Sequence, residues 1–489
     1  MREGKHLLII GSIVTLTMLF ALILNFSPHF YYPYPLHVDE YIHLEAAKQI
    51  LEKGNINNMT DPTGRFQHND MEIGYHIFLS EIFIWTNMKM ENTIFIPVIF
   101  SVFSIIITYI YLRRFSKISA LVAIILIALI PTTVGFLGEK FIVPVNISFI
   151  AIPGVLFLID RYEREPANKN LIPFIPLISI SLLFHPPSGF AVLTIILAYI
   201  ILLAFRLNTE EGVKAKNKIF KILLISAISL VIVIQLFLPL LLSKGIEAGT
   251  FAKQTYLDDI IYFPDYFGIF PLILSATGIF FLIYRKNLLI PLSLLLLLID
   301  LLAYIHFQKI FLFPFGRIYI YISILLSISA AFGVYEILKF KGKFFRVGII
   351  VVVLLISLSM YEQLLHHGPY QLPKHSPYQY YHIMSADGSD YENFVWMKEN
   401  TPKNSTILAD SWKSKGLAIF AERKVYSYFP FGPDVKSLYY CESGDKFLAY
   451  RCNETEFLLN NGIDYVYSCN CENENLTEIR RCVFKVNSD

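Results

Sequence analysis

The chain has 489 residues, of which 55% are hydrophobic and only 16% are charged, whereas an average soluble protein has about 25% charged residues. This composition excludes a disordered chain, an ordinary soluble enzyme and a nucleic-acid binder of the basic-patch kind. The balance of 41 Lys and Arg against 39 Asp and Glu gives no sign of an acidic partner.

The hydrophobic residues gather in uncharged runs of roughly 17–25 residues, the length that a helix needs to cross the hydrocarbon layer. We therefore predict a polytopic α-helical membrane domain over residues 1–365 and a soluble α/β domain over 366–489. Eleven spans are predicted in chain order: Leu7–Phe26, Thr93–Leu112, Ile118–Leu137, Phe141–Ile159, Leu171–Phe184, Phe190–Phe205, Ile219–Leu242, Phe267–Tyr284, Leu288–Ile305, Phe311–Leu338 and Val347–Leu365. The first run lacks a small-residue cleavage site and is expected to stay in the bilayer.

The basic residues predict the orientation of these spans. With the N-terminus in the cytoplasm, the inner segments carry 19 Lys and Arg, and the short outer loops carry 5. The excess of positive charge belongs on the cytoplasmic side. The soluble domain of this multi-pass protein is then expected outside the cell membrane.

The first outer loop, residues 27–92, is long, and long ordered loops are usually functional. It contains His37-Val38-Asp39-Glu40, followed by helical periodicity over Tyr41–Glu52. Asp39 and Glu40 stand at the start of that helix, where negative charge is stabilised, so a capping role is the alternative to a catalytic one. The apolar segment Gly74–Trp85 is too short for a crossing and is expected at the membrane interface.

Other polar groups gather at the predicted outer ends of the spans. Glu139 and Lys140 occupy a turn after the third span, His185 lies between the fifth and sixth, and Arg317 opens the tenth. Each alone is typical of a solvated loop or an interfacial side chain. Together they suit an anionic lipid-phosphate ligand, because Arg and Lys side chains bind phosphate groups. Carboxylates can act as a general base or as metal ligands.

The soluble domain is predicted to hold a helix over Asn393–Lys398 and strands over Ser405–Ala409, Lys424–Tyr428 and Ile463–Tyr467. All five cysteines lie in it, which favours disulfides in an oxidising compartment, with structural zinc as the alternative. We expect Cys441 to pair with Cys452, and Cys482 to pair with Cys469 or Cys471. Cys469 and Cys471 are too close in sequence to pair with each other.

The layout resembles the GT-C class of membrane glycosyltransferases, which take sugars from polyprenyl-phosphate or polyprenyl-diphosphate carriers. Its parts are a first span, a long outer loop with an acidic pair, many further spans and a soluble outer domain. His37-Val38-Asp39-Glu40 is similar to the acidic motif of the first loop in that class. Glu139 matches the place of the second acidic motif, although it is a single Glu here.

The tail is similar to the catalytic subunit of oligosaccharyltransferase. It carries Glu399-Asn400-Thr401-Pro402, then Asp410-Ser411-Trp412-Lys413-Ser414-Lys415-Gly416 and a downstream Glu422-Arg423. In that subunit a Trp-Trp-Asp-Tyr-Gly motif recognises the Ser or Thr of the acceptor. The motif is degenerate here, which argues against glycosylation of Asn sequons.

The resemblance implies an inverting transfer from a polyprenyl-phosphate (dolichyl-type) sugar to an acceptor protein, lipid or glycan on the outer face. Asp39 would be the base, and Glu40 would orient it or share Mg²⁺ or Mn²⁺ with Glu139. Donor phosphate would be bound by Lys140, His185 and Arg317, and acceptor by Asp410 and Trp412. The alternatives are a true oligosaccharyltransferase, a lipid or polysaccharide transporter, and an inactive glycolipid-binding scaffold. A transporter should show internal repeats, and the sequence has none.

Overall fold

The computed structural model describes residues 2–30, 32–56, 72–130, 138–244, 267–307, 315–339, 343–366, 384–385, 387–410, 412–426 and 451–487. The chain divides into two compact units. The first combines Met1–Pro28 with Phe95–Gln379, and the second combines His29–Ile94 with Tyr380–Asp489. The first outer loop, expected as part of the membrane domain, thus clusters with the tail.

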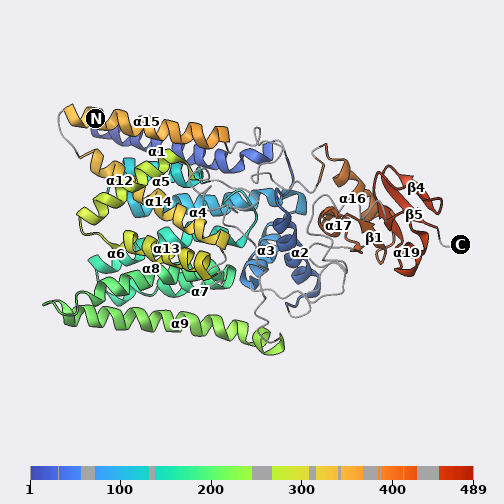
Figure 1. The fold of residues 1–489 in the computed structure, drawn as a ribbon, viewed down its shortest axis with the longest axis horizontal. Coiled ribbons are helices and arrows are strands. Elements are labelled where there is room, and N and C mark those ends of the chain that lie inside the picture. The colour runs from blue at the N-terminus through green and yellow to red at the C-terminus, as the bar shows by residue number, and fades with distance from the viewer. Residues whose placement is uncertain are drawn as a thin grey trace. The chain divides into compact units, whose positions relative to one another are not determined.

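The first unit is a bundle of apolar helices, shown in Figure 1 with α1 and α15 along one edge and α9 along the other. Each of the eleven predicted spans coincides with a helix, and their bounds are α1 Arg2–Phe26, α4 Ile96–Leu112, α5 Lys117–Ala128, α6 Ile147–Arg164, α7 Phe174–Phe184, α8 Pro186–Ala204, α9 Gly212–Lys244, α12 Ile269–Tyr284, α13 Leu289–Phe307, α14 Phe315–Ile337 and α15 Lys343–His366.

By length and composition, the described residues do not confirm eleven membrane crossings. Within the described ranges, six helices are long and apolar enough to cross, or seven if α12 and α13, which meet at a bend of 120°, form one broken span. The helices α5 and α7 have 12 and 11 residues, so each is about 16–18 Å long and cannot alone cross a core of about 30 Å. The predicted count of eleven is not confirmed, because apolar composition does not report where a helix stops.

Helix α14 forms the centre of the bundle, with 94% of its apolar window buried. It approaches α12 so closely that a Cβ on Gly278 would lie 1.7 Å from the carbonyl oxygen of Ser329. Only glycine permits this contact, which is typical of helices packed in membranes. In contrast, only 11% of the apolar window of α9 is buried, so α9 presents its apolar side chains to lipid.

The second unit joins the helices α2 (Val38–Lys53), α3 (Ile73–Thr86), α16 (Ser389–Asn400), α17 (Lys413–Phe420) and α19 (Thr455–Asn460) to a five-stranded sheet. Its strands are β1 Thr406–Ala409, β2 Lys424–Val425, β3 Tyr465–Tyr467, β4 Leu476–Arg480 and β5 Val483–Val486, in the order β2-β1-β3-β5-β4. β1 runs parallel to β2 and β3, and β5 runs antiparallel to β3 and β4. The predicted helix and strands of the tail are thereby confirmed in the described residues.

Two disulfides join the loops around this sheet. Cys452 pairs with Cys471, and Cys469 pairs with Cys482. The expected pairing of Cys482 with Cys469 is confirmed, and Cys469 and Cys471 do not pair with each other. The pairing of Cys452 with Cys441 is wrong, since Cys452 is buried beside Leu458 and Val466 in the core of the sheet domain, where Cys471 reaches it. Cys441 lies outside the described residues.

Candidate functional site

The acidic motif of the first loop forms the start of α2 through a capping box. The backbone N–H of Asp39 donates to His37 Nδ1 at 3.1 Å, and the N–H of His37 donates to Glu40 Oε1 at 2.6 Å. These bonds satisfy N–H groups that the first turn of a helix leaves without partners. The capping residue is therefore His37, and neither acidic residue occupies that position.

This cap gives the two predicted catalytic carboxylates different surroundings. Glu40 is fully buried, with one oxygen bonded to the backbone of His37. The side chain of Asp39 remains 35% exposed, so its carboxylate can reach a substrate. Glu40 fixes the loop that presents Asp39, which fits the predicted orienting role of Glu40.

The α17 segment of the tail packs against α2, the helix whose first turn holds Asp39, and carries a buried lysine. Lys415 is 1% exposed, and its ammonium nitrogen lies 5.9 Å from the ring centroid of Trp412. Burial lowers the pKa of Lys415 to about 7, while the negative charge of Asp39 acts to raise it. The structure thus groups the Asp39 motif of the first loop with the segment 410–416 of the tail in one compact unit.

The predicted acceptor residues flank this lysine. Asp410 accepts hydrogen bonds from the N–H groups of Trp412 at 2.8 Å and Lys413 at 3.2 Å, so its carboxylate holds the turn before α17. Trp412 begins that turn and lies partly exposed beside Lys415. Sequence reasoning missed Lys415, because a lysine near the start of a short polar helix is usually solvated.

Aromatic rings tie the first loop to the tail. The hydroxyl of Tyr32 donates to the carbonyl of Met384 and accepts from its N–H, both at 3.1 Å. The ring of Tyr391 contacts Tyr34 at 5.6 Å and Phe420 at 5.3 Å between centroids. These contacts limit the movement of the segment that leads into the Asp39 motif, as a positioned base requires.

Two histidines, one on α2 and one on α3, meet where these helices pack in the same unit. His43 Nδ1 and His76 Nε2 are 2.8 Å apart, and Glu72 Oε2 lies 3.8 Å from His43. Among the described residues, no three His, Cys, Asp or Glu side chains are arranged to hold a metal ion. Glu40 uses one oxygen on the cap and belongs to a different unit from Glu139, so the Mg²⁺ or Mn²⁺ site stays a prediction.

Glu139 forms a polar centre among the apolar helices of the first unit. It lies in the turn between α5 and α6, 3% exposed. Its Oε2 accepts from Asn25 Nδ2 at 2.7 Å, and Ser101 Oγ lies 3.5 Å away. Its Oε1 has no hydrogen-bond partner within the described part of the chain. Burial raises the pKa of Glu139 to about 7, although the amide and hydroxyl groups favour the charged form.

The three predicted phosphate-binding residues also belong to the first unit. His185 caps the start of α8 by accepting from the N–H of Ser188 at 3.2 Å, and the Tyr321 hydroxyl lies 3.5 Å from the same nitrogen. Burial and the nearby Arg317 hold the pKa of His185 well below its usual value. His185 is therefore a neutral ring that presents its Nε2 proton, while the cation beside it is Arg317. Burial lowers the pKa of Lys140 to about 8.

No protein-family model and no curated protein matches the sequence. Solved structures do match. The archaeal oligosaccharyltransferase AglB from Archaeoglobus fulgidus, in complex with an inhibitory peptide and a dolichol-phosphate, has a TM-score of 0.56 and 14% identity, covering 94% of this chain and 69% of that one. Apo ArnT from Cupriavidus metallidurans has a TM-score of 0.53 and 10% identity over 90% and 91% of the two chains. The chain thus shares the fold of these membrane glycosyltransferases of the GT-C class.

Proposed function

We propose that this protein is an integral membrane glycosyltransferase that moves a sugar from a polyprenyl-phosphate carrier to an acceptor on the extracytoplasmic face. The observation that carries the proposal is the partly exposed carboxylate of Asp39, held at the capped start of α2, against which α17 packs with its buried Lys415. The fold shared with AglB and ArnT supports it.

Asp39 acts as the general base. It accepts the proton of the acceptor hydroxyl as the acceptor oxygen forms its bond to the anomeric carbon of the sugar. The capping box and the contacts of Tyr32 hold the loop in place, so the base is ready within hydrogen-bond reach.

The bond between the anomeric carbon and the carrier oxygen breaks as the new bond forms, and its electron pair leaves with the lipid phosphate. Attack from the side opposite to that oxygen inverts the anomeric configuration. Arg317 and Lys140 stabilise the charge that builds on the phosphate, and His185 contributes a hydrogen bond from Nε2. Asp410 and Trp412 position the acceptor through the turn before α17.

A second candidate is a true oligosaccharyltransferase that modifies asparagine. The likeness to the Archaeoglobus fulgidus oligosaccharyltransferase tethered to a peptide with an NVT sequon favours it, at a TM-score of 0.56 and 13% identity over 94% of this chain and 68% of that one. The degenerate motif around Trp412 favours a hydroxyl acceptor instead. Offering the same lipid-linked donors with a sequon peptide and with hydroxyl acceptors separates the two.

Membranes containing the protein, incubated with a panel of labelled polyprenyl-phosphate sugars, test the proposal directly. Asp39→Asn keeps the size of the side chain but cannot accept a proton, and we expect transfer to fall by ~10²–10⁴-fold, the usual loss for a general base. Glu52→Gln is the matched control, because Glu52 is an exposed carboxylate at the other end of α2. Both variants are measured with and without chelator.

Thermal unfolding accompanies the assay. Asp39→Asn should unfold close to the wild-type temperature, since a charge near a helix N-terminus typically contributes less than about 1 kcal/mol. A folded Asp39→Asn protein that transfers sugar at a near wild-type rate would remove Asp39 as base. Loss of transfer in Glu52→Gln as well would point to damage of the helix itself.

A further inference from the structure

A second polar pocket lies in the first unit, among the ends of α6, α8 and α9, with a cavity volume of ≈ 480 Å³. The size is typical of sites that hold small ligands. Four cations and two carboxylates line it: Arg206, Lys214, Lys218, Lys221, Glu163 and Glu211. The pocket therefore has an excess of positive charge. The charge pattern of the sequence assigns this end of the bundle to the cytoplasm, whereas the proposed glycosyltransfer uses the outer face.

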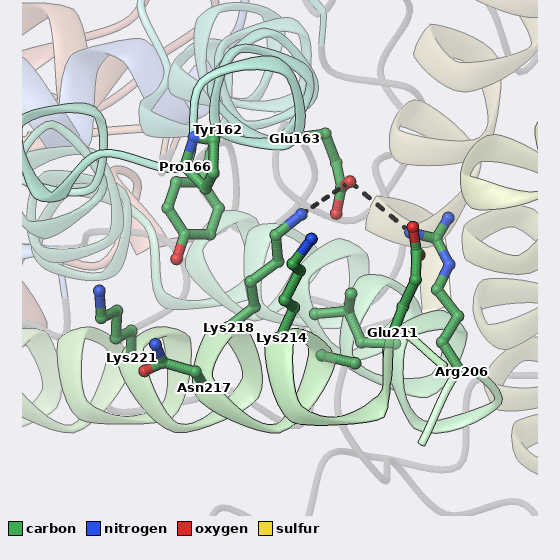
Figure 2. Close-up of a pocket in the computed structure, with 11 residues that line it drawn as sticks. Tyr162, Glu163, Pro166, Arg206, Glu211, Lys214, Asn217, Lys218 and Lys221 are labelled. Carbon is green, nitrogen blue, oxygen red and sulfur yellow. Dashed lines mark hydrogen bonds and ion pairs between the residues drawn. The ribbon is translucent and has the colours of Figure 1, made fainter. Parts of the chain in front are cut away.

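The floor of the pocket is a fixed ion-pair network around Glu163. Lys218 Nζ lies 2.9 Å and Arg206 Nη1 lies 3.6 Å from Glu163 Oε2, and the hydroxyl of Tyr199 donates to Glu163 Oε1. Lys218 is only 16% exposed, with its ammonium group 5.8 Å from the ring centroid of Tyr162. Figure 2 shows Lys218 and Arg206 converging on Glu163 above the first turns of α9. The pocket is therefore lined by partly buried, ion-paired side chains, whereas lysines on an ordinary helix surface are solvated.

The rim of the pocket keeps positive charge that this network does not neutralise. Lys214 points toward Glu163 beside Lys218 (Figure 2), yet it forms no hydrogen bond or ion pair within the described residues. Lys221 donates to the neutral amide oxygen of Asn168 at 2.9 Å, which leaves its charge uncompensated. An anionic ligand that fills the pocket can therefore meet Lys214 near Arg206 and extend toward Lys221 at the other end of the pocket (Figure 2).

The helix that carries these lysines continues directly into lipid. Phe220, Leu224 and Val231 of α9 are 65%, 49% and 53% exposed. A ligand whose phosphate occupies the pocket can thus lay its acyl chains along this apolar surface. Basic pockets between helices on the cytoplasmic side of membrane proteins take such headgroups.

We propose that this pocket binds the phosphate headgroup of an anionic phospholipid of the cytoplasmic leaflet. The phosphodiester oxygens pair with Lys214 and Arg206, and the headgroup hydroxyls reach Lys221 and the amide of Asn217, which also line the pocket. The same cations would also accept a soluble organic phosphate, so the test includes both sources.

The full-length protein in neutral detergent is titrated with phosphatidylglycerol, and bound lipid is counted by native mass spectrometry. We expect Lys214→Gln to weaken binding about fivefold and Lys214→Gln with Lys221→Gln about 25-fold, from the usual worth of one lysine near an anionic headgroup. Lys216→Gln is the matched control, because Lys216 is exposed on the same helix but does not line the pocket. Its binding should stay at the wild-type value.

Equal weakening by Lys214→Gln and Lys216→Gln would overturn the proposal, since it would mean general attraction to a basic helix. Glycerol phosphate that displaces phosphatidylglycerol at equal concentration would overturn the lipid assignment in favour of a soluble phosphate. Binding is read without catalysis, so a failed glycosyltransfer assay leaves the result unaffected.

Discussion

The carboxyl group of Glu139 is buried, and its two oxygens differ in their hydrogen bonding. One oxygen accepts from Asn25 at 2.7 Å, and the other has no hydrogen-bond partner within the described residues. A carboxylate in such surroundings favours its neutral form, which explains why its pKa rises to about 7. Near neutral pH, Glu139 can therefore switch between a hydrogen-bond donor and an acceptor.

This shift predicts how stability depends on pH. The pKa of Glu139 is higher in the folded state than the unfolded value of 4.5, so its stabilising contribution is complete below pH 4.5 and is lost as the pH rises through about 7. The contribution is at most about 3 kcal/mol, from 1.36 kcal/mol per pKa unit. Glu139→Gln should remove this pH dependence and raise the unfolding temperature above pH 7.

Thermal unfolding in detergent between pH 4.5 and 8 measures this dependence. The exposed Glu52→Gln serves as control and should follow the wild-type curve. A Glu139→Gln protein with the wild-type pH dependence would show that Glu139 is ionised in the folded protein throughout this range.

The site roles of Asp39 and Glu40, and of Glu139 after the third predicted span, stay predictions from their place in the sequence. The structure adds the surroundings of each side chain. The difference in exposure between Asp39 and Glu40 was not predictable, because it depends on His37 taking the capping position. Lys415 was not predicted either, since its burial against α2 depends on a contact between segments more than 370 residues apart.

At the scale of the element, α2 explains how one motif yields one buried and one exposed carboxylate. The start of the helix needs partners for its first N–H groups, and Glu40 supplies one for His37. Glutamine at the third helical position serves the same capping box as glutamate. The two amino acids differ in charge, however, and this difference separates a capping role from a metal-binding role.

We predict that Glu40→Gln keeps the stability of the protein and most of its transfer activity. Glu40→Ala should lower the free energy of unfolding by about 1 kcal/mol, the usual loss when a cap is removed, and should slow transfer by loosening the Asp39 loop. Unfolding and transfer are measured on both variants. If Glu40 binds an essential metal, Gln and Ala variants will lose activity alike.

The sheet domain shows what sequence can say about cysteine pairing. Cys469 follows β3 and Cys482 lies between β4 and β5, and their pairing was one of two expected alternatives. The predicted partner of Cys452 was wrong, because the short distance in sequence favoured Cys441. The fold instead buries Cys452 beside β3, where Cys471 reaches it. The order of the strands in the sheet decides which cysteine pairs with Cys452, and the spacing of cysteines in the sequence does not reveal this order.

Peptide mapping without reductant should therefore recover Cys452 linked to Cys471 and Cys469 linked to Cys482. Replacing Cys469 and Cys482 by Ser should lower the unfolding temperature of the isolated full-length protein, since a native disulfide typically contributes about 2–4 kcal/mol. Recovery of a peptide that joins Cys441 to Cys452 would contradict this arrangement.

At the scale of the whole molecule, segments that are far apart in the sequence fall in the same compact unit. Helix positions were predictable, because each apolar run produced a helix. The grouping of the first outer loop with the tail, His29–Ile94 with Tyr380–Asp489, was not predictable from composition, since it depends on contacts such as that of Tyr32 with Met384. Membrane crossing also depends on helix length, which apolar runs overestimate for α5 and α7.

Orientation is the property on which both proposals depend, because the glycosyltransfer is assigned to the outer face and the lipid pocket to the cytoplasmic face. The excess of Lys and Arg in the predicted inner segments supports this orientation. The two disulfides of the tail support it independently, because such bonds persist in oxidising compartments.

Cysteine labelling of intact cells tests the orientation, and the disulfides make it practicable. Four of the five cysteines are paired, so Cys441→Ser gives a background without a free thiol. In that background, Lys403→Cys, at an exposed position after α16, should react with a membrane-impermeant maleimide. Lys214→Cys, at an exposed position in the pocket, should react only after the membrane is opened. Labelling of Lys214→Cys in intact cells would invert the topology, place the basic pocket outside and remove the cytoplasmic leaflet as the source of its lipid.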